Sequence, residues 1–264
     1  MMPTPKKALL TSVTTRDPKG QRAVAQFEAA FNKARLDPDA AQRFNSSKGL
    51  AADYAALLRK HSAKQPDYAR AREILGDDFI SPEDVRKVYQ LQASENENMD
   101  ALPSEDDLRW LKANSYILVP MPHEHLSVLD VRGLDNQLFY SKTGGWYEEQ
   151  AFAKDERTGS YTSWLAIKKT VINGSLNKNW TEQNKLLSDV EHVPNAAEFC
   201  WAVTIYYKVR GIYLFPDTYA RVSSLGSGGL RVRVGDFGAE GLGVNDDWDD
   251  IRYSFLGLSS ARKF

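Results

Sequence analysis

The chain has 264 residues, a hydrophobic fraction of 42% and a formal net charge of -1. This length suits one large domain or two small ones, and the apolar content suits a globular protein with a core. A net charge near zero provides no global field that would select nucleic acid or a membrane as the partner.

Cys200 is the single cysteine, which excludes a disulfide bond within the chain and favours a reducing compartment. The apolar run near the start is too short for a signal peptide, and no run of about 18 apolar residues is present to span a membrane. We therefore expect a cytoplasmic protein without a membrane partner.

Charge is distributed unevenly along the chain. Residues 1–75 carry 14 Lys/Arg and 7 Asp/Glu, whereas residues 76–110 carry 3 Lys/Arg and 10 Asp/Glu. A basic helical surface could attract an acidic connector, or the basic region could bind nucleic acid beside an acidic neighbour. Composition leaves both alternatives open.

The first part of the chain has helical patterns. Asp17-Pro18 opens a helix whose apolar residues Val24, Phe27, Phe31 and Ala34 recur at helical spacing and predict one buried stripe. Further helices are expected at 50–61, from about 66 to Gly76, after Ser81-Pro82 and after Ser104, with residues 93–100 as an exposed connector. We place a helical region at 1–100, with a polar tail at its start, and a second domain at 101–264.

After Asn114 the pattern changes to short apolar runs. Strands are expected at 116–119, 128–131, 138–140 and 164–167, and short helices at 146–153 and 180–187. Asn195 is expected to cap the most apolar helix, which ends at Gly211 and should be buried against a sheet. Cys200 lies within it as a packed side chain.

The last part of the chain predicts a β-rich end. Strands are expected at 219–224, 230–234, 241–244 and 257–262, with a hairpin loop at 226–229. The predicted fold class is α+β, with an N-terminal helical region followed by a mixed domain that contains an irregular antiparallel sheet.

An acidic segment interrupts these strands and is the main candidate site. It consists of Asn245, Asp246, Asp247, Trp248, Asp249 and Asp250. Oxygen-bearing side chains at this density could coordinate calcium, although the segment lacks the glycine and glutamate of an EF-hand loop. Without a cation, Arg252 should lie nearby to balance the carboxylates. The alternatives are a solvated acidic turn and a ligand-facing loop with Trp248 as an apolar platform.

Two other groups of side chains are candidates for binding. Arg221, Arg231 and Arg233 are expected to share one sheet face, where they could hold phosphate or a carboxylate, or pair with Asp236, Glu240 and the acidic segment. His123 and His125 could reach one metal ion, but a zinc site needs further ligands, so two exposed histidines are the simpler expectation. The sequence contains no Gly-x-Ser-x-Gly elbow, Walker loop or Gly-x-Gly-x-x-Gly motif.

Several motifs carry a resemblance to known proteins. They are the segments 140–147 and 177–180 and the terminal run from Gly257 to Phe264. Residues 104–264 resemble an uncharacterised bacterial family that ends in Gly-x-Ser-Ser-Ala-Arg-Lys-Phe and implies no activity. A fainter similarity is to the C-type-lectin-like fold of formylglycine-generating-type domains, carried by Trp248-Asp249-Asp250, Gly257 and Arg262. This second resemblance implies a calcium or ligand edge at the acidic segment.

We expect a non-enzymatic module that binds a small ligand or a protein through its C-terminal loops. Its expected contact residues are Asn245, Asp246, Asp247, Trp248, Asp249, Asp250, Arg252 and Arg221. No cofactor is predicted apart from calcium at the acidic segment. One alternative is nucleic-acid binding through Lys6, Lys7, Arg16, Lys19, Arg22, Lys33, Arg35, Arg59 and Lys60. Another is an enzyme with an unrecognised site.

Overall fold

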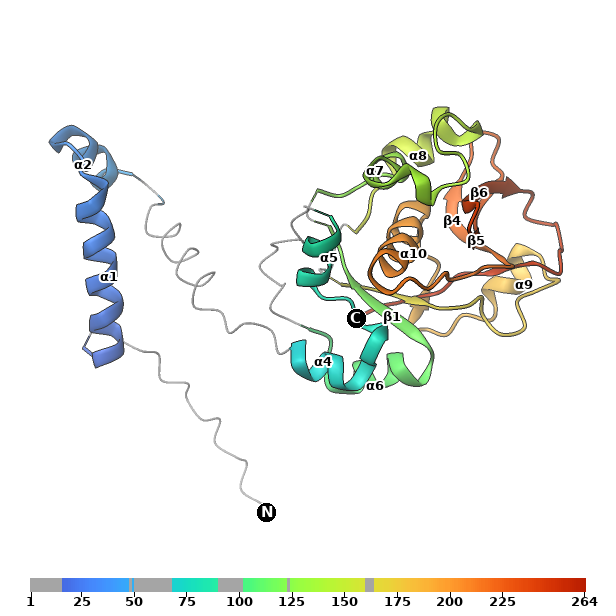
Figure 1. Cartoon of the computed structure of the whole chain (residues 1–264), viewed down its shortest axis with the longest axis horizontal. Coiled ribbons are helices and arrows are strands. Elements are labelled where there is room, and N and C mark those ends of the chain that lie inside the picture. Colours follow the sequence, from blue (N-terminus) through green and yellow to red (C-terminus); the bar gives the residue numbers. More distant parts are fainter. Residues whose placement is uncertain (1–15, 48, 50–67, 90–101, 123, 160–163) are drawn as a thin grey trace, which may run out of the picture. The chain divides into compact units, whose positions relative to one another are not determined.

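Two compact units make up the chain in a computed structural model, Met1–Ala63 and Lys64–Phe264 (Figure 1). The structure describes residues 16–47, 49, 68–89, 102–122, 124–159 and 164–264. Helices and two sheets are present in the described residues, which confirms the predicted α+β class.

The described part of the first unit contains α1 (Pro18–Ala34) and α2 (Pro38–Asn45). The predicted start of α1 is confirmed, because Asp17 is extended and Pro18 occupies the first turn. The expected buried stripe is wrong for this structure, since α1 has no buried residue and Phe27 is 45% exposed. The helix expected at 50–61 lies outside the described residues.

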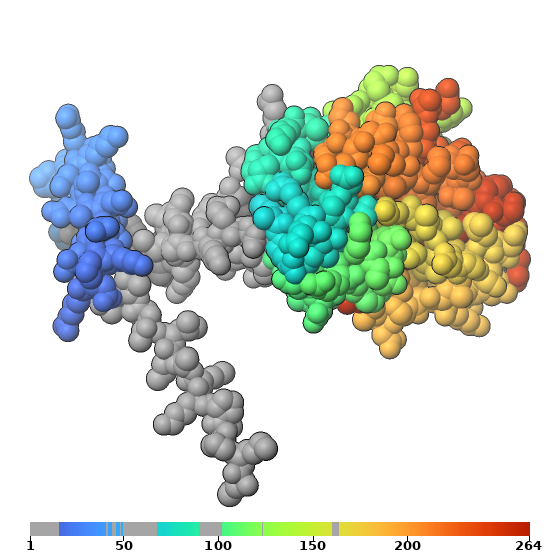
Figure 2. Space-filling view, turned by 60° about the horizontal axis from the view of Figure 1, so that its bottom comes forward, coloured from blue at the N-terminus to red at the C-terminus, as the bar shows by residue number. Residues whose placement is uncertain are grey.

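Residues after Ala63 belong to the second unit, although the sequence predicts the division near residue 100. This flank of the unit contains α4 (Tyr68–Leu75), η1 (Gly76–Asp78), α5 (Pro82–Val88) and α6 (Glu105–Ala113). The predicted caps at Ser81 and Ser104 are confirmed, because both side chains accept a backbone N–H. In the space-filling view, the cyan residues that follow residue 68 pack against the green residues of the same unit (Figure 2).

Hydrophobic packing explains why this flank is part of the second unit. Ala71, Leu75 and Phe79 are fully buried and pack in one cluster. The other buried members of that cluster come from α6 and from two strands at residues 116–120 and 164–168. They are Leu108, Leu111, Tyr116, Leu118, Trp164 and Ala166. The flank and the sheet therefore share one core, which a charge count along the sequence does not reveal.

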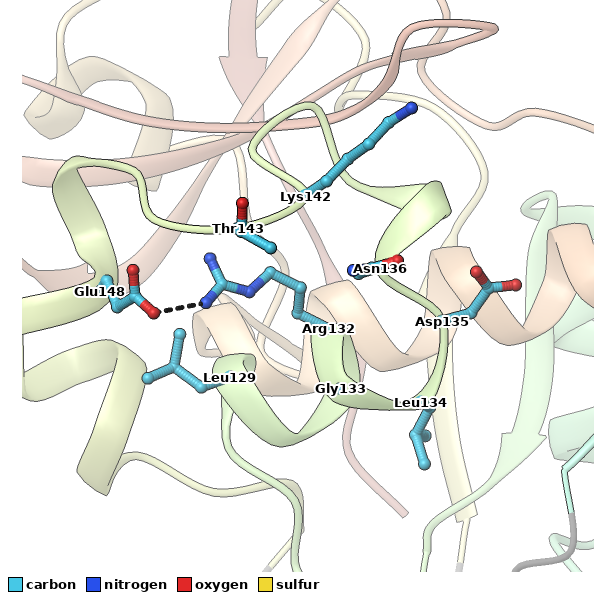
Figure 3. Close-up of a pocket in the computed structure, with 9 residues that line it drawn as sticks. All are labelled: Leu129, Arg132, Gly133, Leu134, Asp135, Asn136, Lys142, Thr143 and Glu148. Carbon is cyan, nitrogen blue, oxygen red and sulfur yellow. Dashed lines mark hydrogen bonds and ion pairs between the residues drawn. The ribbon is translucent and has the colours of Figure 1, made fainter.

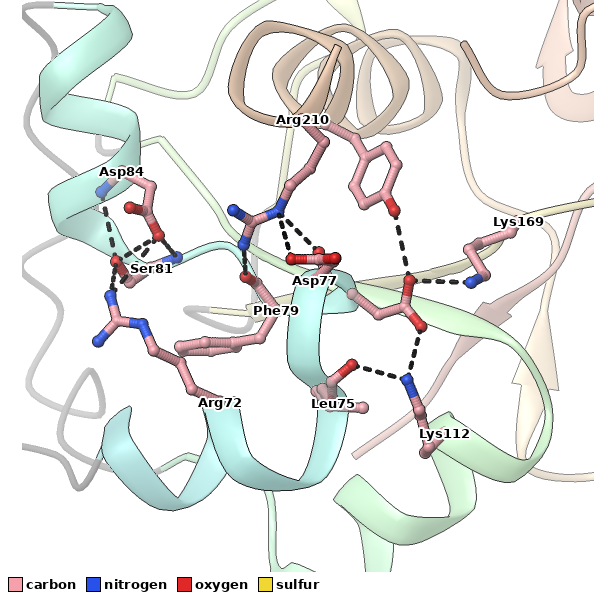
Figure 4. A network of polar contacts seen from close by, with 11 residues as sticks. Arg72, Leu75, Asp77, Phe79, Ser81, Asp84, Lys112, Lys169 and Arg210 are labelled. Atoms are coloured by element: carbon pink, nitrogen blue, oxygen red, sulfur yellow. Dashed lines mark hydrogen bonds and ion pairs between the residues drawn. The ribbon is translucent and has the colours of Figure 1, made fainter. Parts of the chain in front are cut away.

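Polar contacts fix the same flank to the body of the unit (Figure 4). Asp78 is almost fully buried and accepts hydrogen bonds from Lys112 at 3.3 Å, Lys169 at 2.9 Å and the Tyr206 hydroxyl at 3.3 Å. Arg210 donates to the main-chain oxygens of Asp77 and Phe79 at 2.9 and 2.8 Å. A buried carboxylate needs such partners, since leaving it unpaired would cost several kcal/mol.

Two four-stranded sheets form the centre of the second unit. The first has the order β1 (Tyr116–Pro120), β2 (Trp164–Lys168), β8 (Ala261–Arg262), β3 (Glu191–His192). The second has the order β6 (Gly241–Asp247), β5 (Arg231–Gly238), β4 (Tyr219–Leu225), β7 (Leu256–Leu258). These strands pair antiparallel, except that β4 and β7 are parallel.

The central helix α10 (Ala196–Arg210) contacts strands of both sheets (Figure 1). The predicted start and end are confirmed: Asn195 and Glu198 form a capping box, and Gly211 has a φ of 70°. Phe199 and Trp201 are fully buried, and the Trp201 indole donates to the Pro120 oxygen at 2.9 Å. Cys200 is buried, and this burial raises the pKa of its thiol, as suits a packed side chain.

Two predicted strands are wrong. Residues Val128–Leu134 form the helix α7, which begins with a capping box of Ser127 and Asp130. Residues Asn136–Leu138 form the 3-10 turn η2, and Phe139 makes only an isolated bridge to the edge strand β6. Short apolar runs fit a strand or a buried helix equally well, and the serine cap is the signal that decides between them.

The shorter predicted helices are confirmed in part: the one expected at 146–153 is a 3-10 turn and a short α-helix separated by the extended Gln150, and the one expected at 180–187 ends at Asn184. They are η3 (Trp146–Glu149), α8 (Ala151–Asp155) and α9 (Trp180–Asn184). The Trp146 indole donates to the Val244 oxygen on the outer edge of β6 at 2.8 Å. This contact and the Phe139 bridge cover an edge that would otherwise offer free backbone groups.

The end of the chain passes from one sheet to the other. The strand expected at 257–262 is two short strands, β7 in the second sheet and β8 in the first. A Cβ at Gly257 would lie 2.5 Å from the Val171 Cβ, so a side chain does not fit there. Ser259 donates to the Arg221 oxygen at 2.6 Å, and Ser260 donates to Glu191 at 2.8 Å. Close packing accounts for Gly257 of the terminal motif, and internal hydrogen bonds account for Ser259 and Ser260.

Candidate binding surface

The second sheet has one apolar face and one polar, aromatic face. Ala220, Val234 and Val244 lie opposite one another and are buried in the main core. The alternate positions Arg221, Arg233 and Asn245 also lie opposite one another and therefore share the other face. The expectation that Arg221, Arg231 and Arg233 lie on one face agrees with this register.

Arg231 is held between an aromatic ring and a carboxylate. Its guanidinium lies 3.8 Å from the centre of the Trp180 ring. Its Nε and Nη2 donate to the two Asp249 oxygens at 3.1 and 3.2 Å, and its Nη1 donates to the Ser223 oxygen at 2.6 Å. This bidentate contact fixes the positions of both side chains, so Asp249 is engaged in an ion pair within the protein.

Arg233 repeats the arrangement further along the same face of β5. It lies 4.4 Å from the Tyr219 ring centre and 5.6 Å from that of Phe255. Its Nε is 2.6 Å from the Asp247 Oδ2, close enough for an ion pair, although the two atoms are not aligned as a hydrogen bond. Tyr219 has room because its hydroxyl would collide with any Cβ at Gly243.

Arg221 lies on this face but is covered by other segments and has no exposed surface. Its Nη1 donates to the Lys178 oxygen at 3.1 Å and to the Gln183 Oε1 at 2.9 Å. Its Nη2 donates to the oxygens of Trp248 and Ile251 at 3.3 and 2.8 Å. Burial lowers the pKa of Arg221, but an arginine keeps its proton in proteins. Arg221 therefore fixes the main chain after β6 and does not itself reach the surface.

The 248–255 loop connects β6 to β7 and displays aromatic side chains. Trp248 is 60% exposed, Tyr253 37% and Phe255 40%. The Tyr253 and Phe255 rings stack with centres 4.9 Å apart. Arg252 forms an exposed ion pair with Glu182 at 3.0 Å. The loop therefore exposes aromatic side chains, and its main chain is fixed by the hydrogen bonds from Arg221.

The structure brings only some of the predicted contact residues to this surface. Asn245, Asp246 and Asp247 belong to the strand β6, so the predicted loop begins three residues too early. Asp246 lies opposite Val232 and so occupies the other face of the sheet. Burial, together with the charge of Asp247, raises the pKa of Asp246. Trp248, Asp250 and Arg252 are exposed, as a contact role requires.

Within the described residues, no group of three or more His, Cys, Asp or Glu side chains converges as metal ligands would. Asp247 and Asp249 are instead paired with Arg233 and Arg231. Calcium binding at this segment stays a prediction. The metal pair suggested for His123 and His125 cannot be placed, because His123 lies outside the described residues.

Sequence reasoning missed the aromatic residues that complete the surface, namely Tyr219, Trp180, Tyr253 and Phe255. One signal was present, since Tyr253 and Phe255 are two apart and precede a strand, a spacing that puts both rings on one side. The stacking of Trp180 on Arg231 had no local signal, because the two residues come from distant segments.

Basic residues of α1 lie apart from its apolar side. Lys19, Arg22 and Lys33 are exposed and fall within an arc of about 60°, since a helix turns by roughly 100° per residue. Val24 and Phe27 project from a different side of the same helix. The other basic residues predicted to contact phosphates at 6, 7, 59 and 60 lie outside the described residues.

No protein-family model, curated protein or solved structure matches this chain. The helices and sheets define an α+β protein. The two resemblances noted from the sequence stay predictions. Among the described residues, no helix is both long enough and apolar enough to cross a bilayer.

Proposed function

We propose that this protein is a non-enzymatic module that binds another protein through the 248–255 loop. This proposal rests on the exposure of Trp248, Tyr253 and Phe255 in a loop whose main chain is fixed by the buried side chain of Arg221. Protein interfaces are enriched in aromatic residues, and a loop that is already ordered loses less entropy on binding.

The charges around the loop support a protein partner. Arg231 and Arg233 are paired with Asp249 and Asp247, and Arg252 is paired with Glu182. Because these arginines are neutralised locally, the surface has no dominant positive field for a nucleic acid backbone. Aromatic centres surrounded by paired charges match the apolar core and polar rim of a protein interface.

The double substitution Trp248→Ala and Tyr253→Ala is expected to abolish this interaction while leaving the fold intact. Aromatic residues at the centre of an interface often contribute about 2 kcal/mol or more each, so we expect the affinity for a captured partner to fall about 30-fold for each ring removed and several hundredfold for the double variant. The measurement is affinity capture by wild type and variant, followed by titration with the purified partner.

Ile212→Ala is the matched control, because Ile212 is also an exposed apolar side chain but lies at the end of α10. It should capture the same partner as the wild type. Equal capture by the double variant would refute the proposal, and a large fall in its melting temperature would show that the two rings serve the fold instead.

Nucleic-acid binding through α1 is the second candidate, favoured by the shared exposed face of Lys19, Arg22 and Lys33. Changing all three to Gln should reduce the salt dependence of duplex DNA affinity, by about 0.9 in the log–log slope for each phosphate that is no longer neutralised. Fluorescence titrations between about 0.05 and 0.2 M salt measure this slope. Wild-type protein that shows no salt-dependent affinity would exclude this function, and Arg252→Gln is the control.

A further inference from the structure

A cavity of about 500 Å³ opens beside the end of α7 (Figure 3). Its walls come from α7, the start of η2, the loop before η3 and η3 itself. The lining residues are Leu129, Arg132, Gly133, Leu134, Asp135, Asn136, Lys142, Thr143 and Glu148. These elements do not include the 248–255 loop, so the cavity is independent of the proposed function.

Arg132 forms the fixed part of the cavity. It is only 8% exposed, and its guanidinium lies 5.4 Å from the centre of the Tyr147 ring. Its Nη1 donates to the Gly144 oxygen at 2.7 Å and its Nη2 to Glu148 at 3.1 Å, the contact drawn in Figure 3. Arg132 thereby ties the 141–145 loop to α7 and keeps a positive charge at the wall.

The cavity is lined by two cations, Arg132 and Lys142, and two carboxylates, Asp135 and Glu148, and Lys208 from outside the lining adds a third cation. Asp135 is paired with Lys208 at 2.8 Å, and Glu148 is paired with Arg132. Lys142 is exposed and forms no ion pair with the described residues. Its side chain extends away from Arg132 in Figure 3, and its rotatable stem allows it to turn toward a bound ligand.

Neutral donors accompany these cations. The Asn136 Oδ1 accepts from the Gln137 Nε2 at 2.9 Å, which leaves the Asn136 amide N–H groups for another acceptor. Thr143 lines the same space, as do Leu129 and Leu134. Because Lys208 neutralises Asp135, the cavity and its surroundings carry one net positive charge. Together with the neutral donors, this charge is complementary to a small anion that carries several acceptor oxygens.

We infer that this cavity binds a small phosphate-type anion, with Arg132 as the fixed contact and Lys142 as the adjustable one. The ligand is either inorganic phosphate or a phosphate ester of a compact organic molecule. The apolar side chains of Leu129 and Leu134 would accommodate the organic part of an ester.

The test is a titration of the 264-residue protein, followed by amide resonances in two-dimensional NMR. Sodium phosphate, glucose 6-phosphate and sodium chloride at matched ionic strength are the three probes. Saturable shifts at residues 142–145 are expected with phosphate or its ester and not with chloride. Tighter binding of the ester would assign the organic source, and equal or weaker binding would assign inorganic phosphate.

Two substitutions distinguish a binding site from a surface effect. Lys142→Gln should weaken binding about tenfold, because one charge-assisted hydrogen bond is removed. Glu148→Gln should strengthen it several-fold, because the competing carboxylate on Arg132 is removed. Lys154→Gln is the control, since that lysine is paired with Glu149 outside the cavity.

Equal shifts with chloride, or an equal effect of Lys142→Gln and Lys154→Gln, would overturn the inference. The Trp248→Ala and Tyr253→Ala variant should bind phosphate as the wild type does. A negative result for protein binding by the 248–255 loop therefore does not contradict phosphate binding by the cavity, and the reverse also holds.

Discussion

A fragment of residues 101–264 is expected not to fold, whereas residues 64–264 should fold cooperatively with near wild-type stability. The shorter fragment lacks Leu75, Phe79, Ile80 and Val85, all of which are at most 1% exposed. Each buried side chain of this size contributes about 1.5–3 kcal/mol, so together they contribute on the order of 6–12 kcal/mol. That sum equals the whole stability of many domains, which is about 5–15 kcal/mol.

Circular dichroism during urea unfolding provides the measurement for both fragments. A single steep transition is expected for 64–264 and none for 101–264. If the fragment 101–264 unfolded as sharply as the longer one, residues 68–89 would not be part of the core of the second unit. The paired result thus decides between the boundary after Ala63 and the boundary predicted at residue 100.

Replacement of Arg221 by Met is expected to reduce the free energy of unfolding by about 3–5 kcal/mol, because several buried acceptors lose their donor and each unsatisfied group costs about 1–3 kcal/mol. The oxygens of Lys178, Trp248 and Ile251 and the Gln183 Oε1 would lose their donor. Arg221→Lys should restore little, because a lysine ammonium cannot reach four acceptors that are arranged around a planar fork.

Urea unfolding followed by intrinsic fluorescence measures this decrease. The matched control is Arg252→Met, which removes an exposed ion pair with Glu182 and should change stability by less than about 1 kcal/mol. A variant of Arg221 as stable as the control would contradict the role assigned to it. Limited proteolysis should also cut the Arg221→Met variant within the 248–255 loop first, since that loop loses its support.

The candidate surface was only partly predictable from the sequence. The exposure of Trp248 and the shared face of Arg231 and Arg233 follow from a turn-like composition and from alternation along a strand. The burial of Arg221 does not follow, because alternation assigns it to the same face as its neighbours. It is buried because segments 178–183 and 248–251, far apart in the sequence, meet above it.

The phosphate cavity has no signature in the sequence. The apolar run at 128–131 predicts a strand, and only a helix at this place brings Arg132 next to Glu148. The serine cap at 127 is a local signal for that helix, but it does not indicate which loop the helix will meet. The cavity therefore depends on contacts between distant segments that no local sequence pattern indicates.

The amino-acid sequence alone determined the α+β class, the start of α1, the caps at Ser81 and Ser104, and the limits of α10. These features depend on side chains that contact their own backbone or recur with a helical or strand period, so a short window contains their cause. Tertiary structure decided that residues 68–89 complete the core, that β6 extends through Asp247 and that Arg221 supports the loop from below. Each of these depends on which distant segments meet, and burial free energy is gained only once they do.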